Sequence, residues 1–144
     1  MFPDPAPALV IRYSYLWHSE FLAGREEGVK DRPCVIVAAL KRAAGRVRAV
    51  VLPVTHTPPD DPDATIEIPM ETKTRLGLDS ERSWIVVSEW NEFTWPGPDL
   101  RMARDGGEAS AAYGYLPAKL FAKVQAAFGE RVKADRALRV ARTE

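Results

Sequence analysis

Two mostly apolar runs dominate the hydrophobic pattern of the chain, one at residues 34–40 and one at residues 47–54. Both are rich in valine and leucine, and a short polar segment that contains Gly45 separates them. Apolar runs of this length on either side of a polar, glycine-containing turn are typical of an antiparallel β-hairpin. The pattern therefore predicts a long hairpin as the central element of the fold.

The register of this hairpin brings two polar residues together. In a hairpin without bulges, Leu40 pairs with Val47. The same register, continued to the other end of the strands, pairs Arg32 with Thr55. A guanidinium and a hydroxyl would then lie side by side at the open end of the hairpin, with His56 next in sequence. Core packing does not require such a cluster, so we treat it as the candidate functional site.

The rest of the pattern predicts further short strands joined by loops. Residues 8–17 largely alternate between apolar and polar, which indicates a half-buried first strand that ends near Trp17. Further strands are expected at 65–69, 83–95 and 111–115. Segments rich in glycine, proline or charge predict loops at 19–31, 58–63 and 96–107.

Two helical segments are expected. One or two turns at residues 71–76 end at Gly77. Apolar residues that recur every four positions around and after Pro117 predict a C-terminal helix, and these are Leu116, Leu120, Val124 and Phe128. Several short strands with few helices indicate a mainly β fold, namely a small barrel on which the C-terminal helix packs.

The 144 residues are expected to form a single domain. Residues 1–7 carry three prolines and predict a loose N-terminal arm, whereas residues 8–128 hold the barrel and the C-terminal helix. The segment 129–144 contains five basic and three acidic residues. We expect it to be a solvated helical extension, or else a basic tail that faces phosphate or a partner.

Composition narrows the class of protein. Hydrophobic residues make up 46% of the chain and charged residues 28%, as in ordinary soluble globular proteins. No apolar run approaches the roughly 18 residues of a membrane span, and the N-terminus lacks the pattern of a signal peptide. We therefore expect a cytoplasmic protein that has no membrane partner. The net charge is +0, so any contact with nucleic acid must come from a local patch.

The sequence offers little for metal or thiol chemistry. The single cysteine, Cys34, lies within a strand-like run, which favours buried packing over a reactive thiol. A lone cysteine forms no internal disulfide, in agreement with a reducing compartment. Two histidines and one cysteine make no ligand set with recognisable spacing, so we expect neither a metal site nor a cofactor.

The motifs at the two ends of the hairpin resemble those of a known family. Glu27, Lys30, Arg32 and Pro33 precede the first apolar run, and the second run ends in Leu-Pro-Val-Thr at residues 52–55. This pair of motifs at hairpin spacing resembles the MazF/PemK family of toxin endoribonucleases. The match in motifs is confined to residues 27–57, whereas the order of the elements agrees loosely from about residue 8 to about residue 132.

The resemblance implies a small SH3-like barrel of the CcdB/PemK type, commonly a homodimer, that cleaves single-stranded RNA such as messenger RNA without a metal or cofactor. In such enzymes the 2′-hydroxyl of the substrate attacks the adjacent phosphorus and leaves a 2′,3′-cyclic phosphate and a 5′-hydroxyl. Cleavage inhibits translation and growth unless a small antitoxin protein covers the RNA groove. By residue matching, Arg32 takes the place of the family's catalytic arginine and Thr55 that of its catalytic threonine.

The chemistry of these residues fits the implied reaction. Negative charge gathers on the equatorial oxygens of the phosphorane-like transition state, where Arg32 offers a planar fork of donors and Thr55 a compact hydroxyl. Arginine is a poor general base, so we expect His56 to take part in the acid–base step or to contact phosphate. Further candidates for RNA contact are Lys30, Glu27, His18 and Thr57.

Two departures from the family pattern keep alternatives open. The loop after Thr57 has three aspartates within residues 60–63, and acidic groups beside a phosphate track oppose binding. Glu89 and Trp90 stand where relatives often carry a more polar pair. One alternative is a CcdB-like toxin that inhibits DNA gyrase through its C-terminal residues 131–144. Another is a non-catalytic SH3-like interaction module.

Overall fold

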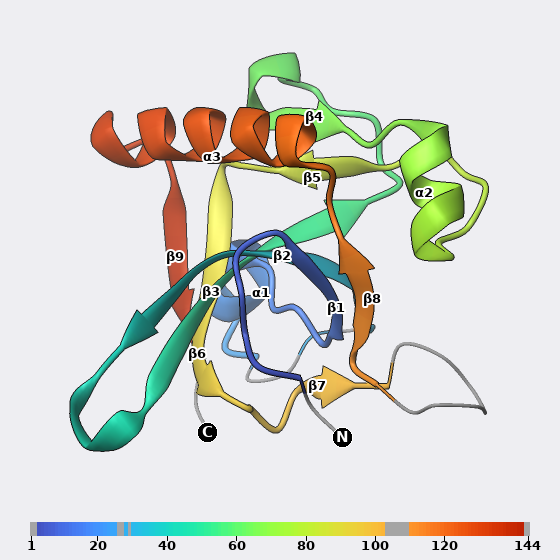
Figure 1. Ribbon diagram of the computed structural model, residues 1–144. Helices are drawn as coiled ribbons and strands as arrows, with labels where there is room; N and C mark the ends of the chain where they lie inside the picture. Colours follow the sequence, from blue (N-terminus) through green and yellow to red (C-terminus); the bar gives the residue numbers. More distant parts are fainter. Residues whose placement is uncertain (1–2, 26–27, 29, 103–109, 143–144) are drawn as a thin grey trace.

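The computed structural model describes residues 3–25, 28, 30–102 and 110–142. Within these residues the fold is mainly β, with nine strands and three α-helices (Figure 1). The strands are β1 (Leu9–Tyr13), β2 (Arg32–Lys41), β3 (Val47–Thr55), β4 (Thr65–Glu67), β5 (Trp84–Val86), β6 (Glu89–Trp95), β7 (Leu100–Arg101), β8 (Ala112–Tyr115) and β9 (Leu138–Ala141). The helices are α1 (His18–Leu22), α2 (Met70–Leu76) and α3 (Ala118–Lys133). None of these helices is long and apolar enough to span a membrane.

In the described part of the chain, the nine strands form one open sheet. Its main path runs β4, β5, β3, β2, β1 and β7, while β6 pairs with β3 and β9, and β8 pairs with β1. All neighbouring strands are antiparallel except β6 and β9, which are parallel. No pairing joins the two ends of the path, so these strands show an open sheet rather than the closed barrel expected from the sequence.

Several elements lie where the hydrophobic pattern predicted them. The structure confirms the β2–β3 hairpin, the short strands β4 and β8, and the helices α2 and α3. Gly77 follows α2 with a φ of 72°, the left-handed conformation that favours glycine at a helix end. Pro117 directly precedes α3, where its missing N–H costs no hydrogen bond.

One β-bulge changes the register of the hairpin. Near the turn Leu40 pairs with Arg48, so the expected pairing of Leu40 with Val47 is wrong. An extra residue between Ile36 and Ala38 then shifts the register by one position. Near the turn the pairing is offset by one residue from the expected register, and the bulge removes this offset. Beyond the bulge Ile36 therefore pairs with Val51, as in the expected register.

The open end of the hairpin keeps the predicted register up to Cys34 and Pro53, the last observed pair of β2 and β3. Beyond this pair Arg32 pairs with Tyr13 of β1 and Thr55 with Trp84 of β5, and the β2–β3 register, if continued by two residues, would set Arg32 opposite Thr55. Opposed residues of an antiparallel pair share one face of the sheet. By this alternation Arg32 and Thr55 lie on the face that carries Cys34, which is part of a buried core.

Each face of the sheet packs against its own core. One core gathers aliphatic residues of β2, β3 and β5 against α3, which contributes Phe121 and Val124. In Figure 1, α3 lies alongside β4 and β5. The other core is aromatic, and the rings of Tyr13 and Phe93 stack with centroids 4.5 Å apart. Burial on both faces explains why β2 and β3 read as apolar runs rather than as alternating strands.

Three segments differ from the sequence-based expectations. The strand expected at residues 8–17 ends at Tyr13, and helix α1 (His18–Leu22) occupies the start of the loop expected at residues 19–31. The side chain of Glu20 accepts a hydrogen bond of 3.0 Å from the N–H of Trp17, and this capping contact starts the helix. The strand expected at 83–95 is broken into β5 and β6, and β7 lies within an expected loop.

The C-terminal segment is not a helical extension throughout. After α3 ends, the chain reverses at Asp135, which has a φ of 55°, and continues as β9 beside β6. Arg142 is buried, with Nη2 2.8 Å from Oδ2 of Asp99 and Nη1 donating a hydrogen bond of 2.6 Å to the carbonyl oxygen of Ser14. These contacts anchor the end of the segment on the sheet, whereas residues 129–133 continue α3 and most of residues 131–142 are exposed, as the expected solvated extension would be.

Candidate functional site

A pocket of about 290 Å³ lies at the end of the β2–β3 hairpin opposite its turn. Its walls come from the ends of β2 and β3, from α2 and the loop after it, and from β8. The polar side chains on these walls include Lys30, Arg32, His56, Lys73, Asp79 and Tyr113. Titratable groups from separate segments of the chain therefore meet at the open end of the hairpin, where we expected the candidate site.

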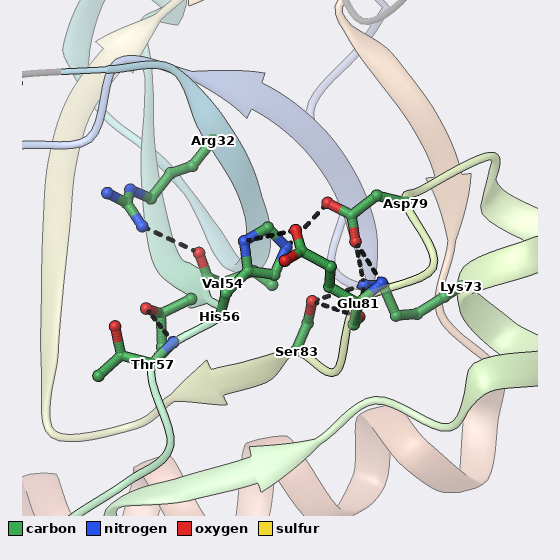
Figure 2. A network of polar contacts seen from close by, with 9 residues as sticks. Arg32, Val54, His56, Thr57, Lys73, Asp79, Glu81 and Ser83 are labelled. Atoms are coloured by element: carbon green, nitrogen blue, oxygen red, sulfur yellow. Dashed lines mark hydrogen bonds and ion pairs between the residues drawn. The ribbon is translucent and has the colours of Figure 1, made fainter.

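The guanidinium of Arg32 is held on two sides. Its Cζ lies 4.9 Å from the centre of the Trp17 ring, and Nη1 donates a hydrogen bond of 3.3 Å to the carbonyl oxygen of Val54 (Figure 2). Nε is buried and has no hydrogen-bond partner among the described residues. An unpaired buried donor costs free energy, which the contacts of the guanidinium with Trp17 and Val54 offset.

Thr55 ends β3 and is half-buried. Its Oγ1 accepts a hydrogen bond of 3.1 Å from the N–H of Thr57, which fixes the turn that follows the strand. Thr55 is not a wall residue of the pocket, although its neighbours Val54 and His56 are. Because the hydroxyl accepts in this contact, its own proton can still be donated to an oxygen of a ligand.

The ring of His56 lies between two carboxylates. Nε2 is 2.8 Å from Oδ2 of Asp79, and Nδ1 is 3.6 Å from Oε2 of Glu81 (Figure 2). The side chain of Glu81 is 71% exposed. The short contact with Asp79 therefore orients the ring, whereas the contact with Glu81 is a long one at the surface that a ligand can displace.

Lys73 braces this group from the interior, with only 1% of its surface exposed. Its Nζ donates hydrogen bonds of 2.6 Å to Oδ1 of Asp79 and 2.6 Å to Oγ of Ser83, and it also donates to the carbonyl oxygen of Glu81. A buried ammonium needs an acceptor for each of its three donors, and all three are satisfied here. Lys73 thereby fixes the loop after α2 and leaves Oδ2 of Asp79 directed at His56.

The same contacts keep Asp79 ionised. Desolvation raises the pKa of Asp79, but hydrogen bonds from Lys73 and from the N–H of Glu81, with the charges of Lys73 and His56, lower it by more. The net pKa of Asp79 lies below its ordinary value of 3.8. Asp79 is therefore a carboxylate at neutral pH, which suits it to orienting an imidazole.

The other candidates for RNA contact do not all meet at the pocket. Lys30 lines the wall, and Thr57 is exposed in the turn after β3. His18 is the first residue of α1 and is not a wall residue, and its N–H donates a hydrogen bond of 2.9 Å to Oε1 of Glu89. Glu27 lies outside the described residues.

The acidic loop is tied to helix α3 rather than to the pocket. Nη2 of Arg131 lies 4.0 Å from Oδ2 of Asp61, and Nη1 donates a hydrogen bond of 3.3 Å to the carbonyl oxygen of Asp63. None of the three aspartates in residues 60–63 is a wall residue of the pocket. Their repulsion of phosphate is thus partly offset by a cation on α3.

Sequence reasoning missed three residues of this arrangement. Lys73 carried a usable signal, because it shares a face of α2 with the buried Leu76, and a lysine at an apolar position of a helix indicates a buried charge. Asp79 and Glu81 carried none, since acidic residues after a helix are ordinary. Only the fold shows that they converge on His56.

The pocket combines fixed cationic donors with an oriented imidazole. Such a combination can hold an anionic group and move a proton beside it. No protein-family model matches the chain, and no curated protein matches it either. Function is therefore inferred from this geometry and from the motifs at the ends of the hairpin.

Proposed function

We propose that the chain is an endoribonuclease of the MazF/PemK type and the toxin of a toxin–antitoxin pair. It cleaves single-stranded RNA without a metal and leaves a 2′,3′-cyclic phosphate and a 5′-hydroxyl. The proposal rests on the end of the hairpin, where Arg32 and His56 line one pocket. The register of β2 and β3, continued two residues past the last observed pair of Cys34 with Pro53, would bring Thr55 opposite Arg32.

In the proposed reaction the 2′-oxygen attacks phosphorus as its proton leaves, and the bond to the 5′-oxygen breaks as that oxygen gains a proton. Arg32 donates to the equatorial oxygens of the transition state, and the hydroxyl of Thr55 adds a second donor. His56, oriented by Asp79, exchanges a proton with the reacting oxygens through Nδ1 once the substrate displaces Glu81.

The proposal also covers the RNA contacts around the pocket, the oligomeric state and the inhibitor. Lys30 and Thr57 contact the RNA backbone on either side of the scissile phosphate, and Glu27 and His18 are further contact candidates. The open sheet is the counterpart of the family's SH3-like barrel. The protein acts in the cytoplasm as a homodimer, and its antitoxin inhibits it by covering the pocket.

Two alternatives explain less of the structure. A gyrase-binding toxin of the CcdB type would act through residues 131–144, but β9 pairs with β6 and Arg142 is buried against Asp99, so much of that segment serves the fold. A purely structural module gives no reason for an imidazole held in a fixed orientation at the pocket wall. A nuclease accounts for this feature.

Induced expression with mapping of RNA ends tests the proposal in cells. Expression of the wild-type chain should arrest growth and create new 5′-hydroxyl ends in messenger RNA, whereas the Arg32→Ala variant, expressed at the same level, should do neither. New ends that are equally abundant with Arg32→Ala would refute the assignment. Growth arrest without RNA cleavage, together with loss of DNA supercoiling, would favour the gyrase-binding alternative.

A further inference from the structure

We propose that His56, Asp79 and Glu81 form a binding site for a divalent transition cation of the Zn²⁺ class, and that occupancy of this site inhibits RNA cleavage. The inhibition rests on the proposed function, whereas the binding does not. Spacing along the sequence did not predict this site, because helix α2 separates His56 from the two acidic residues. The fold brings the three side chains together at the mouth of the pocket.

The distances suit a small cation. One ligand atom from each of the three side chains lies within 4.8 Å of the other two. Zn²⁺ binds nitrogen and oxygen ligands at about 2.0–2.2 Å, which places tetrahedral ligand atoms roughly 3.3 Å apart. Asp79 lies at Nε2 of the ring and Glu81 at Nδ1, so Glu81 must turn toward Nε2 for one cation to contact all three residues. The side chain of Glu81 is 71% exposed and can make this turn, and a cation can enter from solvent.

The carboxylate of Asp79 is already held in place, and the main chain of Glu81 is held beside it. Carboxylates that bind metals are usually held by hydrogen bonds from a second group, which fixes their orientation. Here Lys73 and the N–H of Glu81 both donate to Oδ1 of Asp79, the latter at 3.1 Å, and Oδ2 is left facing His56. Lys73 also holds the carbonyl oxygen of Glu81, so one buried side chain supports the carboxylate of Asp79 and the main chain of Glu81.

Ligand chemistry selects the class of cation. The direct contacts of His56 are two carboxylates, while Lys73 contacts only the far oxygen of Asp79, so a cation beside His56 meets acidic oxygens first even though Lys30 and Arg32 line the same pocket. An imidazole nitrogen with only two carboxylates favours Zn²⁺ and its transition-metal neighbours over Mg²⁺ or Ca²⁺, which prefer oxygen ligands. Three protein ligands also leave a fourth position open to water.

Occupancy by a cation would compete directly with the proposed chemistry. A cation between Asp79 and His56 binds Nε2 and replaces the contact that orients the ring. The single proton of the neutral imidazole then stays on Nδ1, which can no longer accept the proton of the 2′-hydroxyl. The nuclease would thus be inhibited by Zn²⁺ although the reaction itself uses no metal.

Calorimetric titration of the chelator-stripped full chain tests the binding. We expect one Zn²⁺ per chain in the wild type, no binding in His56→Ala, and an affinity reduced about tenfold or more in Glu81→Gln. The chain has two histidines, so His18→Ala is the matched control and should bind as the wild type does. Equal binding of Mg²⁺, no binding of Zn²⁺, or Zn²⁺ binding unchanged in His56→Ala would overturn the site.

A cleavage assay with increasing Zn²⁺ tests the inhibition. The wild type should lose activity over the concentration range in which the calorimeter shows saturation, and Glu81→Gln should need about tenfold more Zn²⁺. Binding without loss of cleavage, or inhibition of both proteins at one concentration, would overturn the regulatory claim. Absence of cleavage by the zinc-free wild type would contradict the proposed function and with it the inhibition, while the binding result would stand.

Discussion

The guanidinium carbon of Arg32 lies 4.9 Å from the centre of the Trp17 ring, and this contact joins the start of β2 to the residue that precedes α1. Tyr15 supports the same ring edge-on, with centroids 5.2 Å apart. A cation stacked on an aromatic face in a partly desolvated site is stabilised by about 1–2 kcal/mol. Trp17 therefore acts as a positioning residue for Arg32.

Replacement of Trp17 should weaken the proposed cleavage through Arg32. We expect Trp17→Ala to lower kcat/KM for RNA about tenfold, since roughly 1.4 kcal/mol of positioning is lost. Trp17→Phe keeps an aromatic face and should restore most of the rate. Steady-state cleavage assays measure kcat/KM for the two variants, and circular dichroism confirms that each is folded. Equal rates for Trp17→Ala and wild type would show that the contact does not position the guanidinium.

Removal of the buried ammonium of Lys73 should destabilise the fold. Lys73→Met leaves Asp79, Ser83 and a carbonyl oxygen without their shared donor, and we expect a loss of about 1.5–3 kcal/mol in the free energy of unfolding. The exposed Lys119 of α3 is the matched control, and Lys119→Met should change stability by less than about 0.5 kcal/mol. Urea denaturation gives both values, and similar losses for the two variants would contradict the bracing role of Lys73.

The carboxyl group of Glu89 should make stability depend on pH. Burial raises its pKa above the ordinary value of 4.5, against the lowering effect of hydrogen bonds from the N–H of His18 and the hydroxyl of Tyr15. The folded chain thus holds this proton more tightly than the unfolded chain. Its contribution is fully present below the unfolded pKa and is lost as pH rises through the folded pKa.

Glu89→Gln keeps the acceptor oxygen and removes the titration. Relative to wild type, the variant should therefore gain stability as pH rises from about 4 to neutral. Urea denaturation of both proteins at several pH values measures this difference. A difference that stays constant with pH, or that changes in favour of the wild type, would contradict burial of this carboxyl group.

The thiol of Cys34 should be inert in the folded protein. Cys34 is fully buried, and desolvation raises its pKa far above the ordinary value, with only partial compensation from the charges of Arg32 and Arg142. We expect no reaction with a chromogenic disulfide reagent at pH 8 until urea unfolds the chain. Rapid stoichiometric labelling of the native protein would show that this core opens easily.

The hydrophobic pattern was enough to predict the elements that form by local rules. The β2–β3 hairpin, the left-handed Gly77 and the helix after Pro117 each follow from a few neighbouring residues. The bulge between Ile36 and Ala38 was not predictable, because the apolar run continues through it unchanged. The strand β9 was missed because its place beside β6 depends on distant contacts such as the ion pair of Arg142 with Asp99.

The candidate site also has a part that local rules predict and a part that depends on long-range contacts. The hairpin itself follows from local geometry, but the register at its open end agrees with the prediction only because the bulge offsets the wrong pairing near the turn. The surroundings of His56 do not follow from local geometry, because Asp79 and Glu81 reach it only after helix α2 has turned the chain back. Long-range convergence of this kind leaves no periodic signal in the sequence.

Cleavage of single-stranded RNA by the purified chain, in excess chelator, tests the nuclease proposal most directly. Arg82 is the matched control, because it also stacks on a tryptophan, 5.0 Å from the Trp84 ring, but lies outside the pocket wall. The wild type and Arg82→Ala should produce 2′,3′-cyclic phosphate ends at equal rates, and Arg32→Ala should be about 10²–10³-fold slower. No cleavage by the wild type, or equal rates for the two alanine variants, would contradict the proposal.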